Sequence, residues 1–139
     1  MKKILLTLMI FVSLCTFSES DNFQRIIPNI LIIENNLERT LLDYSASDEL
    51  GMNQMLAPVG WTEGIVALEF ELRGIVISGT LGLEFKNETI TFKKDDGFVI
   101  PKNTKVRIHN GGDEPLHLVE VLRPGYKEEF VKEYQNFEE

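Results

Sequence analysis

Cysteine is almost missing from this sequence of 139 residues. The single cysteine, Cys15, lies in an N-terminal segment that has the pattern of a leader peptide. Without that segment the chain has no disulfide, no thiol nucleophile and no cysteine metal ligand. We therefore expect an apolar core alone to hold the fold, which is feasible at this length.

Basic residues are also scarce. The 14 Lys and Arg residues are outnumbered by 22 Asp and Glu residues, which gives a formal net charge of −8 at pH 7. Loss of the leader, which contains Lys2 and Lys3, makes the chain more acidic still. Nucleic acids and anionic membrane surfaces are bound through basic surfaces. The charge therefore argues against both as partners.

The first 20 residues have the three parts of a bacterial secretory signal peptide. Two lysines precede an apolar run at 4–14, and Ser18 and Ser20 are spaced like the small residues of a cleavage site. The apolar run is too short to cross a bilayer, which takes about 20 residues. We expect a cleaved signal over 1–20, no transmembrane segment and a periplasmic or secreted protein. A lipoprotein anchored at Cys15 is the alternative, disfavoured by the bulky residue before it.

Helical periodicity is missing between residues 61 and 122. Short apolar and β-branched runs recur there about every 8–12 residues, separated by turn sequences. This spacing predicts an all-β sandwich or barrel and argues against a parallel α/β sheet. The runs are IVALEFEL, RGIVISGTLGLEF, TITF, GFVI, KVRIH and LHLVEVL.

The flanking segments are less regular. Within a lead-in at 21–57, the runs at 30–33 and 37–42 predict a hairpin around Glu34-Asn35-Asn36, because Asn tolerates the positive φ of tight turns. Residues 43–60 are rich in turn formers and predict a loop with at most one short helical turn. In the C-terminal segment 126–139, three aromatic residues lie on one helical stripe, which predicts a short helix or tail packed on the barrel.

The run from residue 69 to 125 resembles the conserved barrel of the cupin superfamily. Its landmarks are a corner, two turns and a loop, namely IVISGTL at 75–81, DG at 96–97, PKN at 101–103 and NGGDEP at 110–115. Their order and spacing are those of the superfamily. The resemblance implies a cupin (double-stranded β-helix, or jelly-roll) barrel over 58–125, and it also implies a homodimer. A set of small bacterial cupins is similar over LAPVGWTEG and the following strands.

Metal-binding cupins carry three histidines and a glutamate that converge on one cation inside the barrel. Aligned on the corner, the glutamate position falls on Leu72, two histidine positions fall near Ile65 and Ala67, and the third falls on Val106. Aliphatic side chains offer no donor atom. The resemblance therefore implies a barrel without the usual metal site, and we expect no metal or other cofactor.

The two histidines are the first candidates for chemistry. If Val106 faces the lumen, strand alternation directs Ile108 inward and Arg107 and His109 outward, unless a bulge reverses the order. We therefore expect His109 to be a surface residue with local hydrogen bonds. His117, at the start of the last run, is interpreted in the same way. A functional role for either histidine stays open.

Polar and aromatic candidates lie where the chain enters the barrel. Glu69, Glu71 and Arg73 form an E-x-E-x-R stripe, which is either a ligand-binding cluster or a solvated face with ion pairs of small value. Trp61 either stacks on a ligand at the mouth or plugs the end of the barrel.

Three functions remain open on these grounds. We favour an exported, metal-free cupin that binds a small ligand or serves as an assembly module. A metal-independent epimerase or isomerase would use His109 or His117 as base, with Glu69, Glu71 or Tyr126 as acid. A metal enzyme with relocated ligands would use Glu69, Glu71 and both histidines. The sequence does not identify a ligand.

Overall fold

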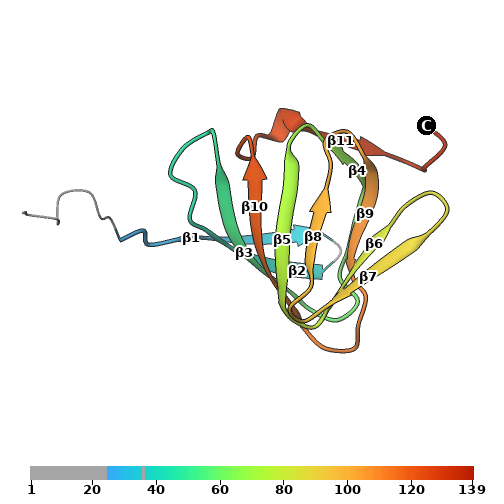
Figure 1. Cartoon of the computed structure of the whole chain (residues 1–139), viewed down its shortest axis with the longest axis horizontal. Helices are drawn as coiled ribbons and strands as arrows, with labels where there is room; N and C mark the ends of the chain where they lie inside the picture. Colours follow the sequence, from blue (N-terminus) through green and yellow to red (C-terminus); the bar gives the residue numbers. More distant parts are fainter. Residues whose placement is uncertain (1–24, 36) are drawn as a thin grey trace, which may run out of the picture.

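Two antiparallel sheets face each other in the computed structural model, which describes residues 25–35 and 37–139 (Figure 1). The signal peptide predicted over 1–20 lies outside the described residues. The six-stranded sheet has the order β1 (Asn29–Asn35), β2 (Leu37–Asp43), β3 (Gly51–Ala57), β10 (Leu116–Arg123), β5 (Glu71–Ser78) and β8 (Gly97–Ile100). The five-stranded sheet has the order β11 (Val131–Tyr134), β4 (Thr62–Leu68), β9 (Lys105–Asn110), β6 (Thr80–Glu84) and β7 (Thr89–Lys93).

The chain crosses repeatedly from one sheet to the other, which closes the sheets into a barrel. From β3 to β6 each successive strand lies in the opposite sheet, and β8, β9, β10 and β11 alternate in the same way. The all-β barrel predicted from the sequence is confirmed. Among the described residues, the only helical element is the 3₁₀ helix Glu128–Phe130, so none is long and apolar enough to cross a membrane.

Strand alternation builds the core between the sheets. In β10 and β9 every second residue is buried, and Leu118, Val76, Leu81 and Val106 are each 0% exposed. Burying such side chains contributes about 1.5–3 kcal/mol each, before the cost of ordering them. No charged side chain is needed to explain why this barrel folds.

A glycine makes the corner between β5 and β6. Gly79 has a φ of +79°, which a residue with a Cβ adopts only at a cost, and a Cβ there would lie 2.6 Å from the carbonyl oxygen of Pro115. This explains the IVISGTL landmark, because the chain must pass close to the end of β10 as it changes sheets.

Asn110 closes the same end of the barrel. Its Nδ2 donates to the carbonyl oxygens of Glu114 (2.8 Å) and Pro58 (3.1 Å), and its Oδ1 accepts from the amide of Gly112 (3.0 Å). The residue is 7% exposed. The first residue of the NGGDEP loop is therefore a structural tie between the β3–β4 connection and the loop before β10.

The N-terminal hairpin is confirmed, but residues 43–60 are not mainly loop. β1 pairs with β2 from Asn29↔Asp43 to Asn35↔Leu37. Residues 51–57 form β3, which lies between β2 and β10 in the six-stranded sheet. The loop prediction over 51–57 is wrong because pairing on both edges outweighs the weak strand preference of its Gly, Asn and Gln residues.

The C-terminal helix predicted over 126–139 is also wrong. After the 3₁₀ helix the chain forms β11, which pairs with β4 from Val131↔Leu68 to Tyr134↔Ile65 and covers its edge. Phe130 and Val131 pack against the core, so packing on the barrel is confirmed.

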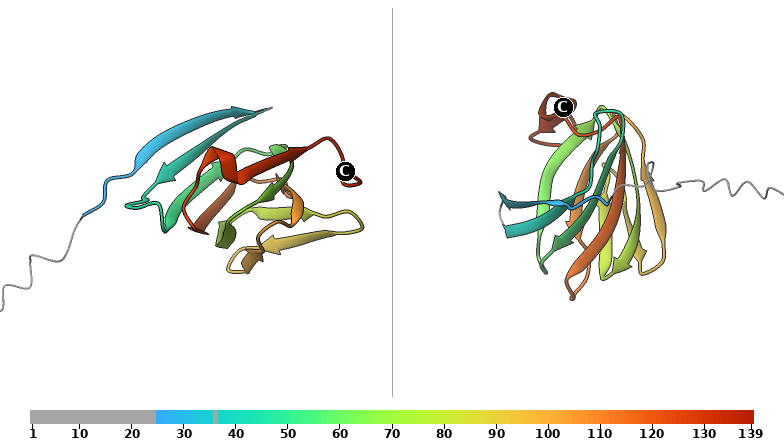
Figure 2. Two further views of the ribbon diagram at one scale, coloured as in Figure 1. Left: turned by 90° about the horizontal axis from the view of Figure 1, so that it is seen from above. Right: turned by 90° about the vertical axis from the view of Figure 1, so that its left-hand side faces the viewer.

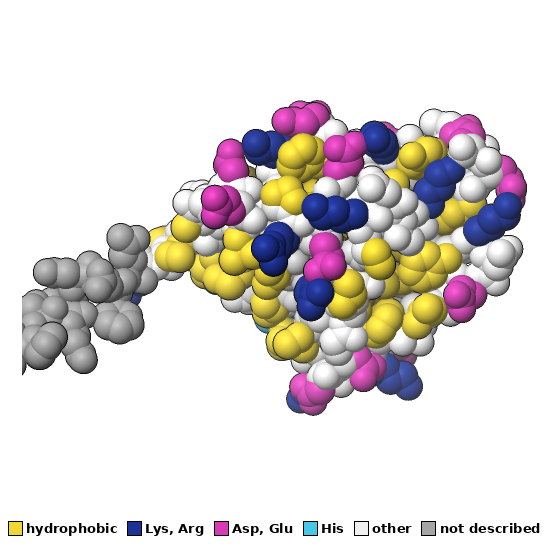
Figure 3. Space-filling view, turned by 45° about the horizontal axis from the view of Figure 1, so that its top comes forward, with side chains coloured by type: hydrophobic (Ala, Val, Ile, Leu, Met, Phe, Trp, Pro, Cys, Tyr) yellow, Lys and Arg dark blue, Asp and Glu magenta, His cyan; other side chains and the backbone are white. Residues whose placement is uncertain are grey.

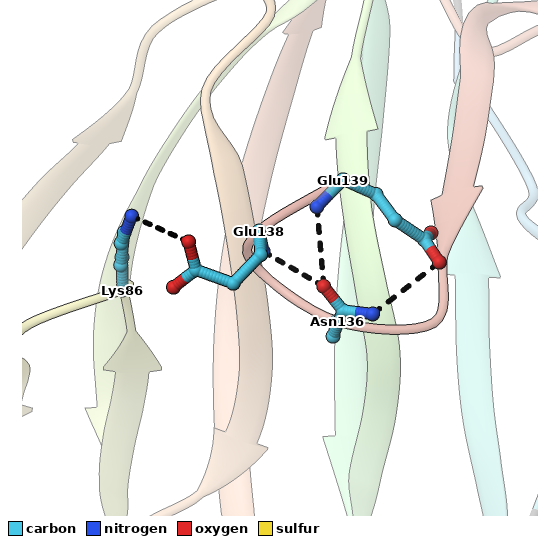
Figure 4. A network of polar contacts seen from close by, with 4 residues as sticks. All are labelled: Lys86, Asn136, Glu138 and Glu139. Atoms are coloured by element: carbon cyan, nitrogen blue, oxygen red, sulfur yellow. Dashed lines mark hydrogen bonds and ion pairs between the residues drawn. The ribbon is translucent and has the colours of Figure 1, made fainter.

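Polar contacts hold the last residues in a turn (Figure 4). The Asn136 Oδ1 accepts from the amides of Glu138 (2.8 Å) and Glu139 (3.1 Å). The Glu138 carboxylate lies 2.8 Å from the Lys86 ammonium, just after β6. The tail is thereby fastened to the five-stranded sheet.

Candidate ligand cavity

A cavity of about 980 Å³ lies between the sheets beneath the β1–β2 hairpin. Seen from above, the hairpin lies to one side of the C-terminal segment (Figure 2), and residues of both line the cavity. The hairpin directs alternate residues inward, among them Arg39 and Leu41. Apolar side chains make up much of the wall, including Val66, Leu68, Phe70, Leu72 and Leu122.

An arginine from β2 crosses to β4 at the cavity wall. Arg39 forms an ion pair with Glu63, and both side chains are mostly buried, with exposures of 20% and 16%. The Arg39 Nη1 also lies 3.4 Å from the Met55 sulfur, and its guanidinium lies 5.1 Å from the centre of the Trp61 ring. Burial raises the pKa of Glu63, and the charge of Arg39 opposes that rise.

Another charged residue of the wall is Glu120, on the inner face of β10 between Leu118 and Leu122. It is 7% exposed, and no hydrogen bond or ion pair from the described residues reaches its carboxyl group. Burial raises its pKa to about 7, the charge of Arg39 lowers it, and the charge of Glu63 raises it further. Its carboxyl oxygens are not sealed in the core but are accessible from the cavity, which makes this carboxyl group a candidate contact for a ligand.

Trp61 lies in the core and not at the mouth. It is 1% exposed, Arg39 packs over its face, and its Nε1 finds no hydrogen-bond partner among the described residues. This corrects the prediction that Trp61 stacks directly on a ligand at the mouth.

The E-x-E-x-R stripe does not form one cluster. Glu69 lies in the bend between β4 and β5, where its carboxylate is 2.7 Å from the Lys132 ammonium of β11 and raises the pKa of that group. Glu71 lies on the outer face of the six-stranded sheet, where its carboxylate accepts from the Arg73 Nε at 2.5 Å. The Arg73 guanidinium lowers the pKa of Glu71. These residues form surface ion pairs outside the cavity. Of the two interpretations of the stripe, the structure therefore supports a solvated face and not a ligand-binding cluster.

The histidines lie on opposite outer faces of the barrel. His109 alternates with the buried Val106 and Ile108, as predicted, and its ring covers Gly82 on the neighbouring strand. The predicted local hydrogen bonds are wrong, because its Nδ1 is buried without a partner among the described residues. His117 Nε2 lies 2.9 Å from Gln54 Oε1, whose amide nitrogen donates to the Tyr44 hydroxyl at 3.1 Å. Neither histidine faces the cavity.

The catalytic and relocated-metal candidates are therefore not brought together. Tyr126 lies at the rim of the cavity and is 62% exposed, so its hydroxyl group is not shielded from solvent as expected for a catalytic acid. Across residues 25–35 and 37–139, no three His, Cys, Asp or Glu side chains are grouped to hold a metal ion. The structure gives no support to a histidine base paired with Glu69 or Glu71, or to a metal held by these four residues.

The positions of the usual cupin metal ligands do not fit a metal. Leu72 and Val106 are buried in the core, at 5% and 0% exposure. Ile65 and Ala67 are buried as well, but the core cluster contains their neighbours Val66 and Leu68. The residues of β4 that belong to the core cluster are therefore Val66 and Leu68, one position later than the predicted Ile65 and Ala67. The residues that replace them are also aliphatic, so the conclusion about the donor set is unchanged.

Sequence reasoning missed Arg39, Glu63 and Glu120. Glu120 had a signal, since it alternates with Leu118 and Leu122 and so belongs to the inner face of its strand. Glu63 had none, because a register shift between Thr62 and Ile65 redirects that part of β4.

A barrel built from two facing antiparallel sheets, with the chain passing back and forth between them, is a double-stranded β-helix. Residues 72–122 match the family model described as the cupin domain. The match covers the part of the barrel from β5 to β10, and the described chain has the cupin fold.

Solved structures support the same fold. The cupin domain of Schizosaccharomyces pombe Cnp3 is 14% identical, with a TM-score of 0.59 over 69% of this chain and 69% of that one. KdgF from a Halomonas species is 16% identical, with a TM-score of 0.59 over 70% and 89%. An RmlC-like cupin from Shewanella frigidimarina is 18% identical, with a TM-score of 0.59 over 75% and 89%. At these identities the likeness concerns the fold alone. Among curated proteins, no sequence matches.

Proposed function

We propose that this protein is an exported cupin that binds a small molecule in its barrel cavity without the usual metal. The observation that carries the proposal is the cavity of about 980 Å³ with the unpartnered, buried Glu120 on its wall. Ligand sites in proteins commonly have volumes of about 300–1,000 Å³ and apolar walls with a few polar groups. The cavity has the size and the composition of such a site.

The donor set supports the metal-free part of the proposal. A cation at the superfamily's position would need imidazole or carboxylate donors, whereas Leu72, Val106, Val66 and Leu68 supply none. The test is the metal content of protein purified without a chelator. A value near zero, with no thermal shift on adding Mn²⁺, Fe²⁺, Ni²⁺ or Zn²⁺, is expected. One bound metal per chain would contradict this part.

A pair of variants tests whether ligands enter the cavity. Leu41 lines the cavity, whereas its neighbour Leu42 points to the other face of β2. A small-molecule screen by thermal shift identifies ligands, and Leu41→Trp should weaken their effect because the larger indole side chain takes up part of the cavity. Leu42→Trp should leave it intact. Equal effects of the two substitutions, or no ligand at all, would contradict the proposal.

We also propose export, on the signal-like pattern of residues 1–20. N-terminal sequencing of protein recovered from the periplasm or medium of a bacterial host should begin at residue 21. Protein that keeps residue 1 and stays in the cytoplasm would contradict this proposal.

The outer face of the six-stranded sheet supports the homodimer that the superfamily resemblance implies. Ile75 is 51% exposed and Val99 is 48% exposed, and Met52, Leu56 and Ile77 are each at least 40% exposed. Figure 3 shows hydrophobic side chains on both sides of a group of charged ones. The charged pair Glu71–Arg73 on this face is already neutralised, which lowers the cost of covering these two side chains.

Sedimentation tests the homodimer. We expect the protein to sediment as a dimer, Ile75→Lys to give monomers, and Ile90→Lys, a substitution on β7 of the other sheet, to leave the dimer unchanged. A monomeric parent protein would contradict the proposal.

A further inference from the structure

Acidic side chains outnumber basic ones on the wall of the cavity, and its basic side chains are already engaged. Arg39 pairs with Glu63, and Arg107 pairs with Glu84 at 2.9 Å. The acidic residues that line the cavity are Asp43, Asp48, Glu63, Glu120 and Glu133. Both cations of the lining are therefore paired with carboxylates, although the Arg39 Nε has no hydrogen-bond partner among the described residues.

Most of these acids have partners, but Glu120 does not. Asp43 accepts from the amide of Ser45 at 2.8 Å, and Asp48 lies 3.4 Å from the Lys127 ammonium. Glu120 is 93% buried, since its exposure is 7%, and it receives no hydrogen bond or ion pair from the described residues. Glu133, which also has no hydrogen-bond or ion-pair partner among the described residues, is exposed at the rim of the cavity. The deep acid is the one that a ligand can complement.

We infer that the cavity takes a small cationic ligand, an amine on an apolar skeleton, whose ammonium group pairs with the Glu120 carboxylate. This inference rests on the proposed function, that the cavity binds a small molecule. A buried carboxylate loses its hydration, and an opposite charge with good hydrogen bonds restores much of the lost stabilisation. The same carboxylate repels sugar acids and phosphate esters.

The apolar wall determines the rest of the ligand. Leu68, Phe70, Leu72 and Leu122 line the same cavity as Glu120. An alkyl or arylalkyl group gains about 25 cal/mol for each Å² of apolar surface that it removes from water against such a wall. A polyamine with several charges would leave ammonium groups against these side chains, so a single amine fits better.

Binding of a cationic ligand is coupled to the loss of a proton from the Glu120 carboxyl group. Two charged groups act on Glu120 from the surrounding strands, namely Arg39 on β2 and Glu63 on β4. Glu133 on β11 acts in turn on Glu63. Because burial holds the pKa of Glu120 at about 7, roughly half of the side chains keep a proton at neutral pH. An ammonium group selects the ionised form. The affinity for an amine should therefore rise about tenfold between pH 6 and pH 8.

Calorimetry on the whole protein tests the inference. The probes are alkyl- and arylalkylamines, each paired with the alcohol of the same skeleton. We expect the best amine to bind at least about tenfold more tightly than its alcohol at pH 8, since a charged hydrogen bond contributes about 1.5–3 kcal/mol. Glu120→Gln should remove both this preference and the rise with pH. Glu69→Gln, which alters a carboxylate outside the cavity, should preserve both.

The outcomes separate the two proposals. Alcohols that bind as tightly as their amines, with binding sensitive to Leu41→Trp, would overturn the cationic ligand and leave the cavity function intact. Failure of every probe and of the wider small-molecule screen would overturn both. The pH profile of the unaltered protein is an independent measurement if Glu120→Gln folds poorly.

Discussion

Replacing Glu120 with Gln should stabilise the protein in a manner that depends on pH. In the unfolded chain this carboxyl group loses its proton near 4.5, whereas burial raises its pKa to about 7 in the folded protein. Between these values the folded state binds more protons than the unfolded state. The free energy of unfolding therefore falls as the pH rises through this window. Below it Glu120 is neutral in both states and imposes no penalty.

The size of the effect follows from the two values. A change from 4.5 to about 7 corresponds to about 3 kcal/mol, at about 1.4 kcal/mol for each tenfold change in proton affinity. Gln has nearly the same shape and cannot ionise, so the variant avoids the penalty. Burial also raises the pKa of Glu63, and Arg73 lowers that of Glu71, but both residues are present in the variant. The difference between variant and parent therefore reports Glu120 together with its coupling to Glu63.

Urea unfolding followed by the fluorescence of Trp61, the single tryptophan, measures this difference. The stability gained by Glu120→Gln should increase by about 3 kcal/mol between pH 4.5 and pH 8. Glu69→Gln is the control, with a gain or loss within about 1 kcal/mol at both values, as for other exposed ion pairs. A difference for Glu120→Gln that stays constant within about 1 kcal/mol would refute the reasoning, because the carboxylate would then be as well solvated in the fold as in water.

Three further predictions concern the barrel itself. Gly82→Ala should lower the free energy of unfolding by about 1–3 kcal/mol, because the ring of His109 occupies the place of the new methyl group. Adding His109→Ala should recover most of this loss. Denaturation of the single and double variants measures it, and additive losses would contradict the prediction. Asn110→Ala should cost about 2–3 kcal/mol, since it leaves buried carbonyl groups unpaired, and an unchanged urea midpoint would count against it. Lys86→Ala should cost less than about 1 kcal/mol, because its pair with Glu138 is exposed; a larger loss that persists in high salt would contradict this.

Local patterns predicted the barrel where alternation and turn residues agree. The strands from β5 to β10 follow the apolar runs, and the inward positions of Leu72 and Val106 and the outward position of His109 follow from a period of two. Each of these strands pairs mostly with neighbours that carry the same clear alternation.

The errors occur where distant pairing decides the structure. β3 has no β-branched residue, yet it is held between β2 and β10, although β10 lies far along the chain, as in the pair Gly51↔Leu122. The aromatic stripe of the tail has the spacing of a helix, but the open edge of β4 recruits Val131–Tyr134 as a strand. Neither effect is visible in a short window of sequence.

The same reason limits what could be predicted of the cavity. Alternation in β10 was enough to direct Glu120 inward, although not to show that the Arg39–Glu63 ion pair would lie near it on the same wall. Arg39 and Glu63 meet because β2 and β4 both contribute residues to the same wall of the cavity. A lumen without metal ligands could be predicted, whereas the charged wall could not.

The position of β3 also determines when the chain can finish folding. Gly51 pairs with Leu122, so one of the earliest strands to leave the ribosome waits for one of the last. Until β10 emerges, the edges of β3 and β5 that it covers are free to pair with another chain. A fragment cut to residues 72–122 lacks β3 and β4, so the edges of β10 and β9 that these strands cover stay open and the fragment should aggregate. During synthesis the intact chain stays incomplete until almost its last strand has emerged.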